Sequence, residues 1–345
     1  MFDGNKLCRD IADLLTMEKD KSDGLLYGNV GIVLFLYVYS HKTAKKAGNK
    51  YEKRADSVLG DILDSQNDKS SPTFENGLAG IGLLIEYLIQ HGYCMGNADD
   101  ILEDFDTRIY KELAFSKDII MDMRIGLVGY MLYIINRLKF PKDNNSICTQ
   151  INRELLIETI NRIDMIAPNT FAMTGKDISF DLLWQFPTLL LSLNEAYKLD
   201  IHNEKIKNVL NQWTFYFSTV IPSIHTHRLS LAVALHMAYK NSDSDKIRKH
   251  ICLLLYSIDP DIIESELDPR LCNSIQYGWV GVSLILTACI EIFDKTYPNY
   301  ETLKMLKSRL IRKYADKLSD EFDKYLSNKE KNRQNALGLL MDGQV

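Results

Sequence analysis

The sequence lacks the features that mark several common classes of protein. Its six cysteines include no Cys-x-x-Cys pair, and 345 residues are too many for a disulfide scaffold, so reduced thiols are expected. No apolar run reaches the roughly 20 residues that span a bilayer, and the first residues show no basic segment followed by an apolar core, so no signal peptide is predicted. These absences predict a cytoplasmic protein without membrane insertion.

Signals for strands and for common nucleotide sites are also missing. There are few alternating β-branched runs, no phosphate-binding glycine loop and no nucleophilic serine elbow. The formal net charge is -5, with acidic and basic residues interspersed. Because nucleic-acid binding needs a clustered basic surface, no nucleic-acid partner is expected.

What the sequence does contain is a recurring glycine phrase, G-x-x-G, at the start of apolar segments. The first three copies are 49 residues apart, and the last clear copy follows 152 residues later, about three periods. Two decayed copies are therefore expected between them, with Trp184 and His227 in the place of the first glycine. The clear copies begin at Gly28, Gly77, Gly126 and Gly278.

Each repeat reads as two helices of different character. The segment after the glycines is apolar all round, which is typical of a helix buried on all sides, whereas the next segment is amphipathic. Six such hairpins predict an all-α fold, a closed α/α toroid with apolar helices inside and amphipathic helices outside. The glycines would permit tight loops and positive φ, and these loops would converge on one end of the ring. Residues 1–325 are assigned to this domain, and residues 326–345 to a charged linker and short tail.

Six such phrases in register resemble the lanthionine synthetase C-like family over about residues 1–325. The resemblance implies a toroid that acts in ribosomal peptide maturation, and a cyclase whose zinc is held by two cysteines and a histidine. Zinc binds a thiol as the thiolate, and three protein ligands leave its fourth position for substrate. At the positions implied for these ligands the chain has His225, Gln276 and Tyr277. This departure predicts that the usual zinc site is missing and that no cofactor is bound.

The glycine framework persists where the implied ligands do not, which favours a scaffold that binds a peptide or a partner protein. The partner would be a ribosomal precursor peptide or a peptide-modifying protein. Candidate contact residues at the rim are Tyr27, His227, Gln276 and Trp279. Aromatic rings suit peptide binding, because they offer apolar area at little entropic cost, but aromatic residues beside glycine also simply pack on bare backbone.

Three alternatives stay open. The first is a divergent cyclase that adds a cysteine thiol to a dehydroamino acid, with Asp122, His225 and Tyr277 as catalytic residues and a relocated zinc site at His225, His227 and Cys272. Asp122 matches an aspartate implied by the resemblance, although it could instead cap the helix that follows. The second is a carbohydrate-active toroid with Asp122 as one of two carboxylates. The third concerns the acidic run at 99–104, which could bind a diphosphate through magnesium or form a solvated helix face.

Overall fold

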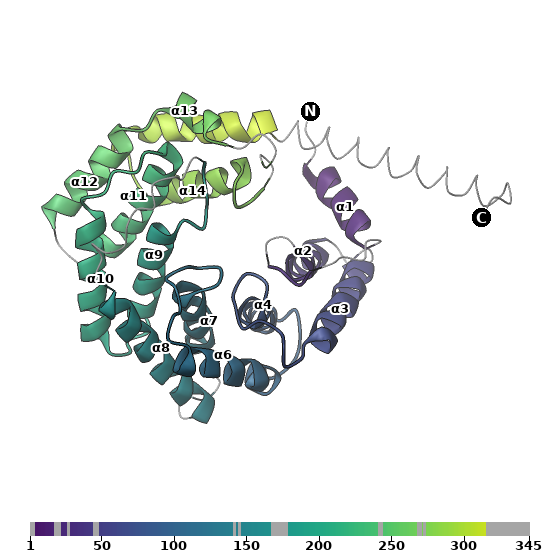
Figure 1. Cartoon of the computed structure of the whole chain (residues 1–345). Coiled ribbons are helices and arrows are strands. Elements are labelled where there is room, and N and C mark those ends of the chain that lie inside the picture. Colours follow the sequence, from purple (N-terminus) through teal and green to yellow (C-terminus); the bar gives the residue numbers. More distant parts are fainter. Residues whose placement is uncertain are drawn as a thin grey trace, which may run out of the picture.

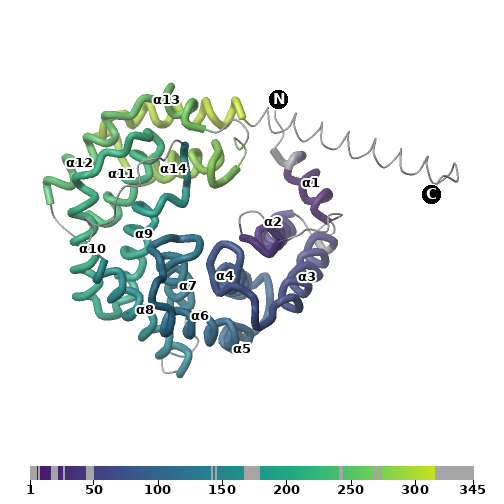
Figure 2. The backbone as a smooth tube through the Cα atoms, viewed as in Figure 1, coloured from purple at the N-terminus to yellow at the C-terminus, as the bar shows by residue number. Residues whose placement is uncertain are grey.

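The chain folds as a toroid built from helices. The computed structural model describes residues 4–16, 22–25, 28–43, 48–140, 143, 146–166, 179–240, 244–267, 271 and 274–314, and all regular secondary structure in these ranges is helical. Figure 1 shows one set of helices around the centre and a second set around the outside. The path of the backbone from one repeat to the next is followed in Figure 2. The predicted all-α toroid is confirmed.

The inner helices correspond to the apolar segments of the sequence. They are α2 (Asn29–Lys42), α4 (Leu78–Gln90), α7 (Leu127–Lys139), α9 (Gln185–Tyr197), α11 (His225–Tyr239) and α14 (Trp279–Ile292). The outer helices are α1 (Gly4–Leu15), α3 (Gly48–Ser65), α5 (Ala98–Ile101), α6 (Glu103–Phe115), α8 (Ile147–Met165), α10 (Asn203–Phe217), α12 (Asp245–Tyr256) and α13 (Pro260–Ser265), followed by helical residues 300–314.

Successive inner helices pack on one another from α2 through α4, α7, α9 and α11 to α14, whereas the described residues of α14 and α2 make at most a marginal contact. The burial of the inner helices follows this arrangement. In α4, nine of thirteen residues are buried, as its all-round apolar character predicts. In α14, Leu284 is 49% exposed. The prediction of burial on all sides is therefore wrong for α14, because this helix lies at the loosest junction of the ring.

The glycines act through close approach of the backbone. At Gly126, an added Cβ would lie 2.1 Å from the carbonyl oxygen of Ile120, which accepts a hydrogen bond from Leu127 N at 2.9 Å. At Gly129, a Cβ would lie 2.7 Å from Cβ of Phe74 in the preceding repeat. Gly126 has φ -132°, in the extended region. The predicted close packing is thus confirmed, and the expected positive φ is wrong at this position.

The two decayed repeats differ in how well the sequence placed them. Trp184 is the N-cap of α9, in the position that glycine holds elsewhere, as predicted. In the fifth repeat the N-cap of α11 is Ile224, three residues before the expected position of His227. His225 and His227 therefore lie in the first turn of a helix and not on a loop. With this boundary, the residue two positions before the N-cap is Pro222, which has no side-chain metal ligand.

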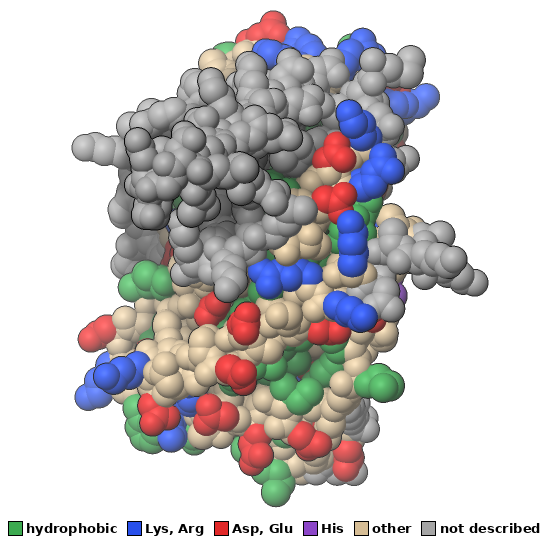
Figure 3. Space-filling model, turned by 90° about the vertical axis from the view of Figure 1, so that its right-hand side faces the viewer, with side chains coloured by type: hydrophobic (Ala, Val, Ile, Leu, Met, Phe, Trp, Pro, Cys, Tyr) green, Lys and Arg blue, Asp and Glu red, His purple; other side chains and the backbone are tan. Residues whose placement is uncertain are grey.

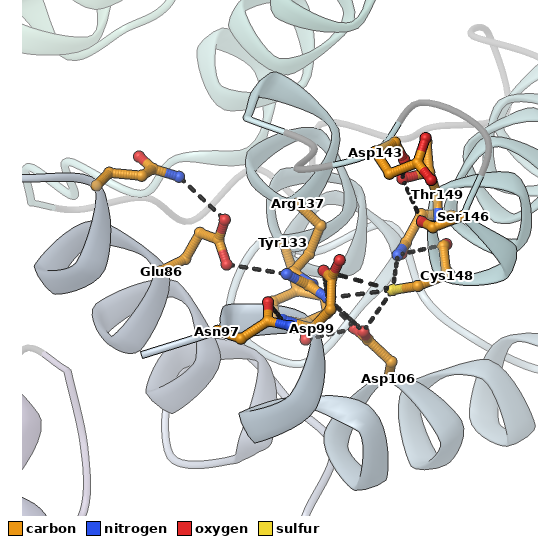
Figure 4. A network of polar contacts seen from close by, with 12 residues as sticks. Glu86, Asn97, Asp99, Asp106, Tyr133, Arg137, Asp143, Ser146, Cys148 and Thr149 are labelled. Atoms are coloured by element: carbon orange, nitrogen blue, oxygen red, sulfur yellow. Dashed lines mark hydrogen bonds and ion pairs between the residues drawn. The ribbon is translucent and has the colours of Figure 1, made fainter. Parts of the chain in front are cut away.

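A buried ionic cluster joins the second and third repeats (Figure 4). Arg137 on α7 is 4% exposed and donates to carboxylates from three other helices: Glu86 at 2.9 Å, Asp99 at 2.8 Å and Asp106 at 2.8 Å. Burial by itself disfavours the charged guanidinium, but the hydrogen bonds and the charge of Asp106 raise the Arg137 pKa. Burial raises the pKa of the neighbouring Cys148 to about 12.

This cluster corrects one alternative. Asp99, in the acidic run at 99–104, is an internal ion-pair partner whose side chain is 27% exposed, so its half of the run is not a solvated face. Its backbone N–H also donates to the Asn97 side chain, which caps α5.

The surface mixes charges of both signs. On the face in Figure 3, basic side chains lie mostly in the upper part and acidic ones mostly in the lower part, with no continuous basic field. Within the described ranges, no helix has the length and apolarity needed to cross a membrane. The predicted tail at 326–345 lies outside the described residues, and the domain boundary at residue 325 stays a prediction.

Candidate functional site

The loops that precede the inner helices are joined to one another at one end of the ring. Backbone hydrogen bonds link the first loop to the second, with Leu25 N donating to Glu75 O at 3.1 Å, and the second to the third, with Phe74 N donating to Arg124 O at 3.0 Å. Leu182 N donates to Gln276 O at 2.8 Å, which links the fourth loop to the sixth. The predicted convergence of the loops is therefore present.

In three of these loops, a polar side chain shortly before the inner helix accepts hydrogen bonds from the backbone of the loop. Asp122 Oδ1 accepts from the backbone N–H groups of Arg124 at 2.7 Å and Ile125 at 3.0 Å. Asp181 Oδ1 accepts from Leu183 N at 2.9 Å, and a serine does the same in the sixth loop. Aspartate commonly forms such turns with the backbone two residues on. Asp122 is thus a loop-forming residue, and its catalytic role stays a prediction.

Four side chains from three repeats meet at this end, and we call them the Arg124 cluster: Arg124, Asp181, Gln276 and Tyr277. Arg124 Nη1 donates to Tyr277 Oη at 3.0 Å, and Nη2 lies 3.4 Å from Asp181 Oδ2. Gln276 Nε2 donates to Asp181 Oδ1 at 3.1 Å and to Tyr277 Oη at 2.7 Å. Arg124 and Tyr277 are 153 residues apart in the sequence.

The cluster has an accessible side and a buried side. The side chains of Arg124 and Asp181 are 31% and 21% exposed, whereas Gln276 is completely buried. Burial alone would lower the Arg124 pKa, but electrostatic interactions with Asp181, Tyr277 and Asp122 and the hydrogen bond to Tyr277 outweigh it and raise the pKa. The cluster therefore presents a permanent cation to solvent. Gln276, predicted as a contact residue, instead supports Asp181 and Tyr277 from behind.

The donor set of the cluster does not fit zinc. Gln276 presents its amide N–H groups to the cluster as donors, and a donating N–H cannot coordinate a cation. The guanidinium of Arg124 is 3.0 Å from Tyr277 Oη, so a divalent cation bound at the phenol would be repelled. Within the described residues, no group of three or more His, Cys, Asp and Glu side chains is arranged to hold a metal ion.

The two histidines of the alternative metal site each accept a hydrogen bond from the backbone of a different segment through a ring nitrogen. His225 Nδ1 accepts from Asp259 N at 2.8 Å, and the backbone N–H of His225 donates to Glu266. His227 Nε2 accepts from Asp181 N at 3.1 Å, and its ring stacks on Trp184 at 4.4 Å between centroids. His227 is 2% exposed, so it packs beneath the rim rather than lining it. The third proposed ligand, Cys272, lies outside the described residues.

Stability is expected to depend on pH through His227. Burial lowers the pKa of this histidine from 6.5 to about 4. Between these values the unfolded chain binds a proton that the folded chain does not. The stabilisation is therefore complete above pH 6.5 and falls as the pH decreases toward 4, by about 3 kcal/mol in total. Urea denaturation at several pH values measures this slope. In His227→Gln, which keeps an acceptor for Asp181 N, the slope between about pH 6.5 and 5 should flatten, and an unchanged slope would assign it to other groups.

Two aromatic residues predicted to contact a peptide at the rim remain, Trp279 and Tyr27, and the structure describes only the first. Trp279, the first residue of α14, stacks on Tyr314 with ring centroids 5.7 Å apart, which fits the packing interpretation. Tyr27 lies outside the described residues. Arg124 and Asp181 were not predicted as site residues. A signal for Asp181 does exist, because it precedes its helix by nearly the same interval as Asp122 does, whereas nothing local connects Arg124 with Tyr277.

A cavity of about 390 Å³ opens beside the Arg124 cluster. It is lined by apolar side chains with a few polar ones, among them Arg124 and Leu183 from the loops, Leu132 and Asn136 from α7 and Glu195 from α9. Its volume lies in the range of small-ligand sites in proteins. The cation of the cluster therefore stands at one end of an apolar cavity.

The fold and site define a class of protein: an all-α toroid whose loops assemble a polar cluster at one end. Residues 19–179 match the family model described as lanthionine synthetase C-like protein. The whole chain resembles nisin cyclase in structure, with a TM-score of 0.58 and 15% identity over 94% of this chain and 87% of that one. No curated protein sequence matches the chain. At this identity the structural likeness shows the fold. Residues 19–179 are thus similar to the lanthionine synthetase C-like family, and the chain shares its fold with nisin cyclase.

The matched segment ends before α9, so the last three inner helices lie outside it. These helices belong to the two repeats in which the glycine phrase decays and to the sixth, where Gln276 and Tyr277 stand at the positions for which the resemblance implies zinc ligands.

Proposed function

We propose that this chain is a zinc-independent peptide-binding protein of ribosomal peptide maturation. It would act in the cytoplasm as a scaffold for a precursor peptide or for a peptide-modifying partner protein. One observation carries the proposal: Gln276 and Tyr277 are hydrogen-bonded to the Arg124–Asp181 pair. The free thiols of the five described cysteines are compatible with a reducing compartment.

The Arg124 cluster has the chemistry to hold a peptide. A guanidinium presents several N–H donors in one plane, which suits carboxylates and backbone carbonyl groups. A tyrosine adds apolar area with a polar end, and the adjoining cavity accepts apolar side chains. The guanidinium supplies a fixed positive charge at the place where the resemblance implies a metal.

Zinc content tests the first half of the proposal. Protein purified without chelators from zinc-supplemented medium is expected to hold far less than one zinc per chain by elemental mass spectrometry. The control is the double variant Gln276→Cys, Tyr277→His, which restores two zinc-ligand types and should raise the zinc content if the site is otherwise intact. One zinc per chain in the wild type, lost in His225→Ala, would contradict the proposal and support the cyclase with a relocated site.

Peptide retention without cyclisation tests the second half. A synthetic peptide with one cysteine and one dehydroalanine is incubated with the protein, and its free thiol is titrated by alkylation. The wild type should retain the peptide in gel filtration without consuming thiol faster than a blank. Arg124→Gln should weaken retention up to about tenfold, since a hydrogen bond to a charged donor is lost. Thiol loss catalysed by the wild type would contradict a purely scaffolding role.

A further inference from the structure

The cavity beside the Arg124 cluster extends along α7. Its lining residues run from Arg124, in the loop before α7, to Lys139, the last residue of that helix. The α7 residues that line it run from Leu132 to Lys139, over which the helix rises about 10 Å, at 1.5 Å per residue. The cavity is thus a channel along α7, walled on its other sides by α4 and α9, which supply Leu83 and Glu195. In Figure 1, α4 and α7 are seen nearly end-on near the centre of the ring.

The length of the channel limits how much of a chain it can hold. An extended chain advances about 3.3 Å per residue, so about three residues lie along the stretch of α7 that lines the channel. An extended chain leaves its backbone carbonyl groups free to accept hydrogen bonds, whereas a helix uses them internally.

One polar group inside the channel has no hydrogen-bond partner among the described residues. Asn136 lines the channel on α7, and its Nδ2 is buried with no hydrogen-bond acceptor among the described residues. Most buried polar groups in proteins are hydrogen-bonded. The walls around it are apolar, contributed by Leu83, Leu132 and Ile135. A backbone carbonyl group of a bound chain would supply the missing acceptor.

We propose that this channel binds an extended peptide segment with apolar side chains, and that Asn136 Nδ2 donates a hydrogen bond to a backbone carbonyl of that segment. The proposal rests on the proposed peptide-binding function and states where the peptide lies. Charged groups stand at both ends of the channel: Arg124 and Glu75 at the loop end, and the Lys139–Glu195 ion pair, 2.7 Å apart, at the other. The side chains of Lys139 and Glu195 are 37% and 29% exposed, so that end is open to water.

The test uses a fluorescein-labelled heptapeptide of alternating leucine and serine, measured by fluorescence anisotropy with the full-length protein. A matched probe has aspartate in place of each leucine. The wild type should bind the leucine probe at least about tenfold more tightly than the aspartate probe, since the channel walls are apolar. Asn136→Leu removes the donor and keeps the size, and it should weaken binding of the leucine probe about three- to tenfold.

Two blocking variants make the location decisive. Leu132→Trp fills the channel from α7, and Leu83→Trp fills it from α4, so that either one serves if the other fails to fold; both should abolish probe binding. The control is Leu253→Trp on the outer helix α12, where the leucine is 46% exposed, and it should bind the probe normally. Circular dichroism establishes that each variant is folded.

The outcomes separate this inference from the proposed function. If the folded blocking variants still bind the leucine probe, the channel is not the peptide site, and the peptide-binding function stands. The same holds if the wild type retains the dehydroalanine peptide but ignores the leucine probe. If the wild type retains neither peptide, both proposals are wrong.

Discussion

Replacing Arg137 by methionine lowers the free energy of unfolding by about 3–5 kcal/mol, the usual loss when one partner of a buried ion pair is removed. Arg137 is the cation that three carboxylates share, and the Glu86 side chain is only 4% exposed. Without the guanidinium, three carboxylates stay close together with no cation between them, and Glu86 and Asp106 are mostly shielded from water. Urea denaturation near neutral pH measures the loss.

The matched control is Lys198→Met, which removes the cation of an exposed pair with Glu195 on α9. The Lys198 side chain is 51% exposed, and such pairs contribute about 0–1 kcal/mol. The difference between wild type and Arg137→Met should also shrink as the pH falls, because protonated carboxyl groups no longer need the cation. Equal losses in the two variants would show that the cluster is not a buried stabilising element.

Gly126→Ala is expected to destabilise the protein by about 2–4 kcal/mol, in the range of substitutions that force the backbone to move. The added Cβ would meet Ile120 O at 2.1 Å and the backbone of Asp122 at 2.8 Å. Because backbone atoms cannot rotate away as a side chain does, the loop itself must shift. That loop carries Arg124, so peptide retention should fall together with stability.

Gly60→Ala provides the control for this prediction. Gly60 lies within α3, and a Cβ there would meet no atom within 4 Å. Alanine is favoured over glycine in a helix by about 1 kcal/mol, so Gly60→Ala should stabilise the protein. The two substitutions make the same chemical change but should have opposite effects on the stability of the protein. Thermal unfolding of both variants decides the matter, and a stable Gly126→Ala protein would contradict the role assigned to close backbone approach.

Several features of the fold follow from local sequence. The apolar segments after Gly77 and Gly126 form inner helices, and Trp184 marks the fourth repeat, because helix periodicity and capping depend on residues close together in the chain. The turn formed by Asp122 is local in the same way. The repeat spacing places the start of the fifth inner helix wrongly, because neither Ile224 nor His227 is a glycine and no other nearby residue marks where the helix begins.

The site itself was decided by tertiary structure. The sequence alone determined six helical repeats, loops that meet at one end, and the presence of Gln276 and Tyr277 where the resemblance implies zinc ligands. Only the circular arrangement of the helices brings Arg124 to Tyr277 across 153 residues. The same is true of Arg137, whose partner Glu86 is 51 residues away. Charge pairing acts through space and leaves no periodic trace in the chain, so the sequence showed which residues carry charge, and the packing of the helices decided which of them meet.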